Sequence, residues 1–300
     1  MFPKVIVCQY NLYHTYRAAE YWSVQITYAR TIDLPAQPRA KGDARVSVRL
    51  RDGKSVIRGL RQSGASKLLF PKTASNDLTA VILNCAGGVT GGDQFSTQAR
   101  VGRNAGLVMT TQAAERAYRA QPKEIGTIDT RLTVAPNARL AWLPQETLIY
   151  DGASIKRRLR IRLARSAQVL ACEMLVMGRT AQAEHLTQLQ LADDIDIIRD
   201  GRLIFADRLR LSNDAERTLQ GPAVLAGARS LATVILAAPG VGTLVDALRP
   251  TLPEKCGIAA PDPDLLVARL TADDSFLLRQ TIVPLLARLG VDPLPRTWML

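Results

Sequence analysis

The chain has 300 residues, of which 47% are apolar, and its 39 lysines and arginines exceed 27 acidic residues to give a net charge of +12. A chain of this length and apolar content can bury a sizeable core, and we expect one compact body. Its four cysteines lie far apart with no Cys-x-x-Cys pair, which argues against a disulfide framework and against a structural zinc site.

Residues 1–38 differ in composition from the rest of the chain. Five of the seven tyrosines and one of the three tryptophans fall in this segment, which ends at Pro35 and Pro38. We predict that residues 1–38 are an N-terminal extension, either disordered or the result of a mis-assigned translation start, and that residues 39–300 form a single domain. The apolar run at 5–7 is too short for the core of a secretory signal peptide.

A basic segment follows over residues 39–72, with ten lysines and arginines against two acids. Within it, Val46, Val48 and Leu50 alternate with polar residues and predict a strand, and Asp52-Gly53 predicts a hairpin turn.

A second basic run lies at 156–165 and alternates with aliphatic residues, so Arg158, Arg160 and Arg162 are expected to share one face of a strand while the aliphatic side chains point inward. Both basic runs could attract polyanions or acidic protein surfaces, and both could equally be solvated sheet faces. Nucleic-acid modules usually interleave aromatic residues for stacking, and the second run has none. We therefore expect no nucleic acid partner.

A glycine-rich loop starts after an apolar strand: four glycines occupy the six positions 87–92, and the loop closes on Asp93. Glycine reaches positive φ and permits the close approach of another chain or a ligand. The loop lacks the lysine of a phosphate-binding P-loop and the spacing of the dinucleotide fingerprint. It is therefore either a tight turn without a ligand or a loop shaped for a close contact.

Period-two patterns predict further strands at 128–134 and at 196–205, the latter folded back at Asp200-Gly201. Residues 112–119 fit a short helix, and 275–289 fit a longer one near the C-terminus that contains Pro284. These patterns predict a mainly β fold with a few helices, and they leave a sandwich, a barrel and a coiled β architecture open. The most apolar window, 231–248, falls short of the ~20 apolar residues of a membrane helix, so we expect a cytoplasmic protein with no membrane partner.

Candidate catalytic side chains are scarce. Only His14 and His185 could serve as histidine bases, and the nucleophile-elbow pattern Gly-x-Ser-x-Gly is absent. The pairs Asp193-Asp194 and Asp273-Asp274 lie in polar stretches that resemble turns, where solvation or helix capping is the default for a carboxylate. We therefore predict no catalytic residue and no tightly bound cofactor.

Four acids stand within motifs whose surroundings are apolar: Asp93, Glu115, Glu146 and Glu184. Carboxylates with amide and hydroxyl neighbours are hard oxygen ligands, which can pass on a divalent cation without the tight grip of thiolate and imidazole. The alternative is that these acids pair with nearby arginines, namely Arg116, Arg119 and Arg179, and hold the fold.

Four motifs occur in order along the chain: Asn-x-x-Gly-Gly-x-x-x-Gly-Asp at 84–93, Thr-x-Gln-Ala-Ala-Glu-Arg-x-Tyr-Arg at 110–119, Trp-Leu-Pro-Gln-Glu at 142–146, and Gly-Arg-x-Ala-x-x-Glu at 178–184. With these motifs the chain resembles the urease accessory protein family UreD, also called UreH, over residues 39–298. Two positions depart from the family pattern: Cys85 stands where threonine is usual, and Ala183 where glycine is usual. If that glycine serves the backbone shape, the placement of Glu184 is affected.

The resemblance implies a β-rich, helically wound scaffold without catalytic activity, which binds apo-urease subunits and recruits UreF and, through UreF, the GTPase UreG. It also implies that nickel is in transit through the interior of the protein toward urease. Carried over to this sequence, Asp93 and Glu184 are the first candidates for the nickel path, followed by Glu115 and Glu146. Two other functions stay open: a small-molecule enzyme with the glycine loop as a substrate cradle, and a polyanion-binding module driven by the basic segment.

Overall fold

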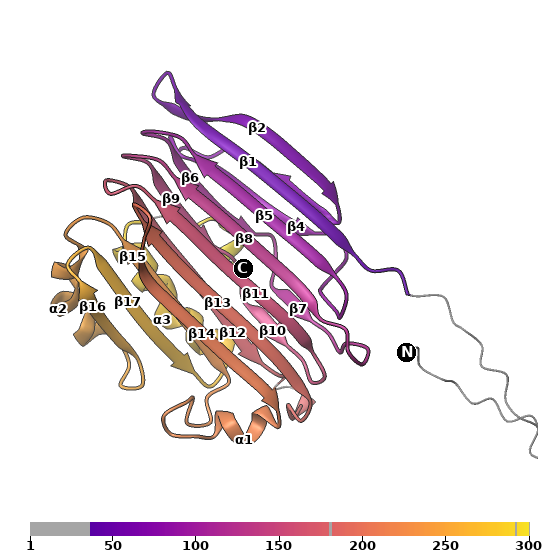
Figure 1. Cartoon of the computed structure of the whole chain (residues 1–300). Helices are drawn as coiled ribbons and strands as arrows, with labels where there is room; N and C mark the ends of the chain where they lie inside the picture. Colours follow the sequence, from indigo (N-terminus) through magenta and orange to yellow (C-terminus); the bar gives the residue numbers. More distant parts are fainter. Residues whose placement is uncertain (1–36, 180–181, 292, 300) are drawn as a thin grey trace, which may run out of the picture. The chain divides into compact units, whose positions relative to one another are not determined.

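Two β-sheets contain most of the chain in the computed structural model, which describes residues 37–179, 182–291 and 293–299 (Figure 1). The extension predicted over 1–38 lies outside these residues, apart from its last two. In the described part, sheet A has seven strands in the order β14, β13, β11, β8, β5, β1, β2. Their bounds are β1 (Lys41–Arg51), β2 (Lys54–Gly64), β5 (Gln94–Val101), β8 (Gly126–Val134), β11 (Ser154–Leu163), β13 (Leu189–Arg199) and β14 (Arg202–Asn213).

Sheet B has ten strands among the described residues. Eight of them follow the order β16, β17, β15, β12, β9, β6, β4, β3, while β10 pairs with β12 and β7 pairs with β10. Their bounds are β3 (Ser66–Leu69), β4 (Leu78–Asn84), β6 (Gly106–Thr111), β7 (Glu115–Ala117), β9 (Arg139–Leu143), β10 (Thr147–Ile149), β12 (Gln168–Met177), β15 (Ser230–Ala237), β16 (Gly257–Asp262) and β17 (Leu265–Ala272).

Between β4 and β13 the chain winds from one sheet to the other and back. It runs through β4 in sheet B, β5 in A, β6 and β7 in B, β8 in A, β9 and β10 in B, β11 in A, β12 in B and β13 in A. Strands one turn apart pair in parallel, so β5, β8 and β11 lie side by side, as do β4, β6 and β9 (Figure 1). The prediction of a mainly β, helically wound body with few helices is confirmed.

Antiparallel hairpins flank the wound strands. The turns Asp52-Gly53 and Asp200-Gly201 join β1 to β2 and β13 to β14, and all four turn residues have positive φ. Positive φ at both central residues is the geometry of the two-residue hairpin turn that matches strand twist. Both predicted hairpins are confirmed.

The core has three apolar clusters. Two of them fill the space between the sheets, and the third lies on the outer face of sheet B under α3 (Ser275–Arg288) and α2 (Val245–Leu248). Strand β12 is therefore buried on both faces, and its sequence is a nearly continuous apolar run. The remaining helical segments are short: α1 (Ala215–Leu219), η2 (Val241–Leu244), η3 (Arg249–Thr251) and η4 (Arg296–Trp298).

Of the two predicted helices, the one near the C-terminus is confirmed as α3. Asp274 caps it, because its Oδ1 accepts a hydrogen bond from the Leu277 amide at 2.8 Å. The helix predicted at 112–119 is wrong, because residues 115–117 form β7 and pair with β10. Tertiary strand pairing overrides the local helical pattern there. No helix in the described part of the chain is long and apolar enough to span a membrane.

The outer face of sheet A is polar. On β11 the aliphatic residues Ile155, Leu159 and Ile161 are buried between the sheets, while Arg158, Arg160 and Arg162 point outward, as the alternation predicts. Arg158 pairs with Asp194 at 3.8 Å and Arg160 with Asp196 at 3.4 Å, both from the neighbouring strand β13.

Candidate functional site

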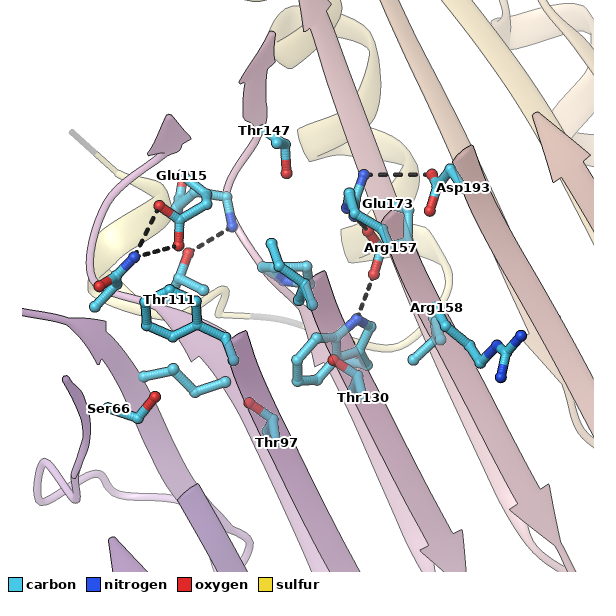
Figure 2. Close-up of a pocket in the computed structure, with 18 of the residues that line it drawn as sticks. Ser66, Thr97, Thr111, Glu115, Thr130, Thr147, Arg157, Arg158, Glu173 and Asp193 are labelled. Carbon is cyan, nitrogen blue, oxygen red and sulfur yellow. Dashed lines mark hydrogen bonds and ion pairs between the residues drawn. The ribbon is translucent and has the colours of Figure 1, made fainter. Parts of the chain in front are cut away.

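A polar layer interrupts the apolar packing between the two sheets. A cavity of about 80 Å³ lies there, with room for a few water molecules. Its walls include Leu159 from one apolar cluster and Phe95 from the other. The polar lining comes from both sheets and includes Thr97, Thr130, Arg157 and Asp193 of sheet A, and Glu115, Thr147 and Glu173 of sheet B (Figure 2).

The alternation of β11 directs Arg157 into this layer. Residues 155, 157, 159 and 161 share the inner face of the strand, and only residue 157 in this set is charged. Figure 2 shows Arg157 between Glu173 and Asp193, whereas the neighbouring Arg158 points away from them. Parallel pairing of β11 with β13 places residue 193 directly beside residue 157. The long-range register therefore builds the charged group.

Arg157 is the centre of a buried ion-pair group. Its guanidinium donates to a carboxylate oxygen of Glu173 and, through Nη1, to Oδ2 of Asp193 at 3.3 Å. The other oxygen of Glu173 accepts a hydrogen bond from Nε1 of Trp142 at 2.6 Å. The three charged side chains are only 7–9% exposed. Burying ions in this way costs several kcal/mol per ion by desolvation, which pairing offsets only in part.

Burial shifts the proton affinities of the group. Burial raises the pKa of Asp193 to about 6, with the Arg157 charge opposing this rise and the Glu173 charge adding to it. Burial alone would lower the pKa of Arg157, but the charges of Asp193 and Glu173 outweigh it and raise that pKa. Arg157 therefore keeps its charge, and Asp193 is the member whose charge can change near neutral pH.

Glu115 reaches the same cavity from β7. Nδ2 of Asn84 donates to its two carboxylate oxygens at 3.2 and 3.1 Å and also to the Gly88 carbonyl at 2.9 Å. Burial raises the pKa of Glu115, although the Asn84 hydrogen bond opposes the rise. The glycine loop is thus connected through Asn84 to one of the predicted nickel-path acids.

Glu146 lies in the connection from β9 to β10. Its carboxylate accepts from Nη2 of Arg279 on α3 at 2.7 Å, and its backbone carbonyl accepts from the Glu115 amide at 2.9 Å. The preceding residue, Gln145, lines the cavity and donates to the Thr297 carbonyl at 2.9 Å. Glu146 therefore follows a cavity-lining residue in the sequence, but its own carboxylate is paired with an arginine of the helix that covers the outer face of sheet B.

Asp93 is the last residue of the glycine loop, and its carboxylate accepts hydrogen bonds from two backbone amides. Its Oδ1 accepts from the Ala40 amide at 2.7 Å and its Oδ2 from the Thr90 amide at 2.9 Å, and the side chain is buried. Both carboxylate oxygens are thus bonded to backbone, which fixes the start of β5 against the segment before β1.

Glu184 and Arg179 form a two-pronged ion pair, with Nη2 to Oε1 at 2.8 Å and Nε to Oε2 at 3.0 Å. The pairing alternative is thus confirmed for Glu184. Burial alone would raise the pKa of Glu184, but the hydrogen bonds from Arg179 and from the Asp151 amide outweigh it and lower that pKa. Ala183, which replaces the usual family glycine, has a φ of 48°. The left-handed backbone that glycine would favour is therefore kept, and Glu184 still reaches its partner.

The four predicted acids do not form one cluster. Glu115 lines the cavity, Glu146 contacts the helix side, and Asp93 and Glu184 lie in loops bonded to backbone and to Arg179. The described residues contain no group of three or more histidine, cysteine or acidic side chains arranged to hold a metal ion. That any of these acids contacts nickel stays a prediction.

The sequence analysis misplaced one acid pair and overlooked two residues. Asp193 and Asp194 do not lie in a turn: they are buried in the middle of β13, one facing the cavity and the other facing Arg158. Arg157 lies within the basic run at 156–165, so nothing in the sequence distinguishes it from the arginines beside it. Glu173 is the only charged residue in the apolar strand β12, and that isolation is a sequence signal for it.

The glycines of the loop are explained by close packing against a distant segment of the same chain, around residues 116–118. A side-chain carbon at Gly88 would lie 2.3 Å from the Tyr118 ring and 2.7 Å from the Arg116 carbonyl. Val89 and Tyr118 also exchange backbone contacts, with the Tyr118 amide donating to the Val89 carbonyl at 2.8 Å. The close approach is thus to another segment of the same chain, which gives the substrate-cradle alternative no support.

The wound sheets and their buried charged layer define this chain as a coiled β protein whose apolar core contains one polar layer. Residues 40–299 match the family model described as UreD urease accessory protein. The chain is 46% identical over 272 residues to the urease accessory protein UreD of Ruegeria sp. (strain TM1040), covering 88% of this chain and 91% of the relative. It is 44% identical over 271 residues to UreD of Roseobacter denitrificans, covering 90% and 99%. It is also 38% identical over 264 residues to UreD 1 of Brucella abortus, covering 87% and 94%.

The chain belongs to the UreD urease accessory protein family. The family named from the motifs is therefore confirmed. The relatives are named as accessory proteins, which agrees with the scarcity of catalytic groups in the sequence. Among the described cysteines, Cys172 is buried, and burial raises the pKa of its thiol well above the usual value.

Proposed function

We propose that this protein is a maturation factor without catalytic activity of its own, which acts in the cytoplasm as a scaffold for nickel insertion into urease. In this role it binds apo-urease subunits, recruits UreF and, through UreF, brings the GTPase UreG to the complex. Membership of the UreD family supports the role.

The proposal includes a passage for nickel through the polar layer between the sheets. The observation that carries it is the buried group of Arg157, Glu173 and Asp193 beside a cavity that Glu115 also lines. Apolar residues of the same volume often give a fold that is at least as stable as one with a buried ion group, so a gain in folding stability does not explain why these charges are buried. Carboxylate oxygens suit a divalent cation in transit, because they exchange it readily.

Within this proposal Glu115 is the strongest candidate for direct contact with nickel. Its carboxylate faces the cavity and is held by neutral Asn84 rather than by an arginine. Asp93 is held by two backbone amides, and Glu146 and Glu184 are each paired with an arginine cation that nickel would have to displace. They remain proposed path residues of lower rank.

The test is urease activation in a reconstituted system of apo-urease, this protein, UreF, UreG, nickel and GTP. We expect Glu115→Gln and Glu173→Gln to lower the nickel content of urease severalfold while capture of urease and UreF stays unchanged. Glu254→Gln, at an exposed site without a hydrogen bond in the described structure, is the matched control. Full nickel loading with both cavity variants would refute the passage, and failure of the unaltered protein to bind urease or UreF would refute the scaffold role.

A further inference from the structure

The outer face of sheet A carries ordered rows of arginine, because parallel pairing aligns equivalent positions of successive turns. Arg45, Gln98, Arg131, Arg160 and Asp196 are direct neighbours in one row across β1, β5, β8, β11 and β13. Arg131 and Arg160 are adjacent in this row, and like charges directly opposite each other on a sheet destabilise it. Each must therefore be compensated.

In this row the compensation comes from within the sheet. Arg45 pairs with Asp43 at 2.9 Å, Arg131 with Asp129 at 2.6 Å, and Arg160 with Asp196 at 3.4 Å. The acids are two residues before the arginine on the same strand, or in the same row on the next strand. Each arginine of this row therefore already has an acidic partner on the sheet, and Asp43 and Asp196 are each shared with a second arginine, Arg61 and Arg208.

The adjacent strip of arginines lacks such compensation. Where β1, β5 and β11 end, five exposed arginines have neither an ion pair nor a side-chain hydrogen bond to any other described residue: Arg49, Arg100, Arg103, Arg162 and Arg165. We call them the arginine strip. Arg100 and Arg162 lie in one row with Thr133 between them, which puts their strands about 10 Å apart. That separation is about one Debye length at 0.1 M salt, so the charges act together.

We propose that the arginine strip docks an acidic surface of a folded protein partner in the urease assembly. The inference rests on the proposed scaffold role. Helices α2 and α3 contact strands of sheet B, and α1 contacts β14 at the edge of sheet A. The seven strands of sheet A, of about ten residues each, give a wall of roughly 900 Å². That area is about one partner's share of a stable interface, near 800 Å². The strip supplies the positive side of such a contact.

A protein partner fits this face better than nucleic acid. The exposed aromatic side chains of the described chain, Tyr118 and Phe276, lie after β7 and on α3 rather than on sheet A. Without them bases have no stacking platform.

The experiment compares the full chain with Arg100→Glu/Arg162→Glu, co-expressed with the cognate urease subunits and UreF. Arg217→Glu/Arg288→Glu makes the same charge change at exposed positions on α1 and α3 and is the control. We expect the strip variant to bind one of the two partners at least about tenfold more weakly, with an unchanged Tm, and Arg100→Gln/Arg162→Gln to lie between it and the parent. Capture by the parent should fall between about 0.05 M and about 0.5 M salt.

Poly-L-glutamate and a poly(dT) oligonucleotide serve as separate probes. We expect the strip variant, but not the control, to lose affinity for poly-L-glutamate. If strip and control variants bind both partners and poly-L-glutamate equally, the docking role is refuted. It is also refuted if the strip variant loses only the oligonucleotide. If the parent protein binds neither urease nor UreF, the scaffold proposal fails. In that case, a strip variant that loses affinity for poly-L-glutamate while the control variant keeps it would still support an acid-binding arginine strip.

Discussion

Replacing Arg157 by methionine tests the energetics of the buried layer. The change removes the only cation between Glu173 and Asp193, whose side chains are 7% and 9% exposed. Breaking a buried ion pair from one side costs about 3–5 kcal/mol, because the remaining charge is neither hydrated nor paired. Asp193 can reduce this cost by taking up a proton, since burial already raises its pKa to about 6 with Arg157 present.

Thermal unfolding followed by circular dichroism measures this cost. For a domain of this size, each kcal/mol lowers Tm by about 2–4 °C, so we expect Arg157→Met to lower Tm by roughly 6–20 °C. The triple variant Arg157→Met/Glu173→Gln/Asp193→Leu removes all three charges while Gln keeps an acceptor for Trp142 Nε1. We expect it to recover most of the loss, to within about 2 kcal/mol of the parent, because apolar replacement of a whole buried ion group is often neutral.

Two results would contradict this reasoning. An Arg157→Met variant that melts within about 2 °C of the parent would mean that water already screens the layer. A triple variant as unstable as the single one would mean that the charges stabilise the fold, which would remove the main argument for a functional interior. If the triple variant is stable but loads urease poorly with nickel, both arguments hold.

Further predictions concern the glycine loop and two titrating acids. Gly88→Ala should destabilise the protein by about 3 kcal/mol in urea unfolding because its Cβ would meet Tyr118, whereas Gly87→Ala, with open space at that position, should cost about 1 kcal/mol; equal effects would refute the packing argument. Because the folded pKa of Asp193 exceeds its unfolded value of 3.8, its contribution to stability should fall by up to about 3 kcal/mol as pH rises from about 4 to about 6, and Asp193→Asn should remove this part of the slope while the part from Glu115, whose pKa is also raised, remains. The folded pKa of Glu184 is depressed, so its contribution to stability is present above about pH 4.5 and is lost as pH falls through the folded pKa; a Glu184→Gln variant that shows the same acid limb as the parent would refute this.

Sequence patterns were sufficient where the information is local. The hairpins at Asp52-Gly53 and Asp200-Gly201 follow from turn chemistry, and α3 follows from helical spacing and the Asp274 cap. Periodicity could not select the winding, because it depends on which strands pair across the two sheets. The resemblance supplied that part. The segment 112–119 failed because a three-residue strand leaves no periodicity to detect.

The residues of the candidate site could be predicted only in part, because their positions also depend on which distant strands pair. Glu115 stood out because a family motif surrounds it, but Arg157 and Asp193 are 36 residues apart and meet only through the register of β11 with β13. An acid in a polar stretch has the same local signature in a turn and in a strand whose partner is distant. Glu173 carried the clearest unused signal, a lone charge in an apolar strand.

The strict alternation of β11 restricts how this gene can change in length. Inserting or deleting one residue before Arg157 would exchange the two faces of the strand. The outward-facing arginines would then point into the interior, and the buried aliphatic residues would be exposed to water. Because β8 and β13 lie in register on either side, the disturbance would reach both neighbours. Viable length differences among homologous genes should therefore concentrate in connections such as the Asp200-Gly201 turn, and an alignment that places a gap inside β11 should be regarded as misplaced.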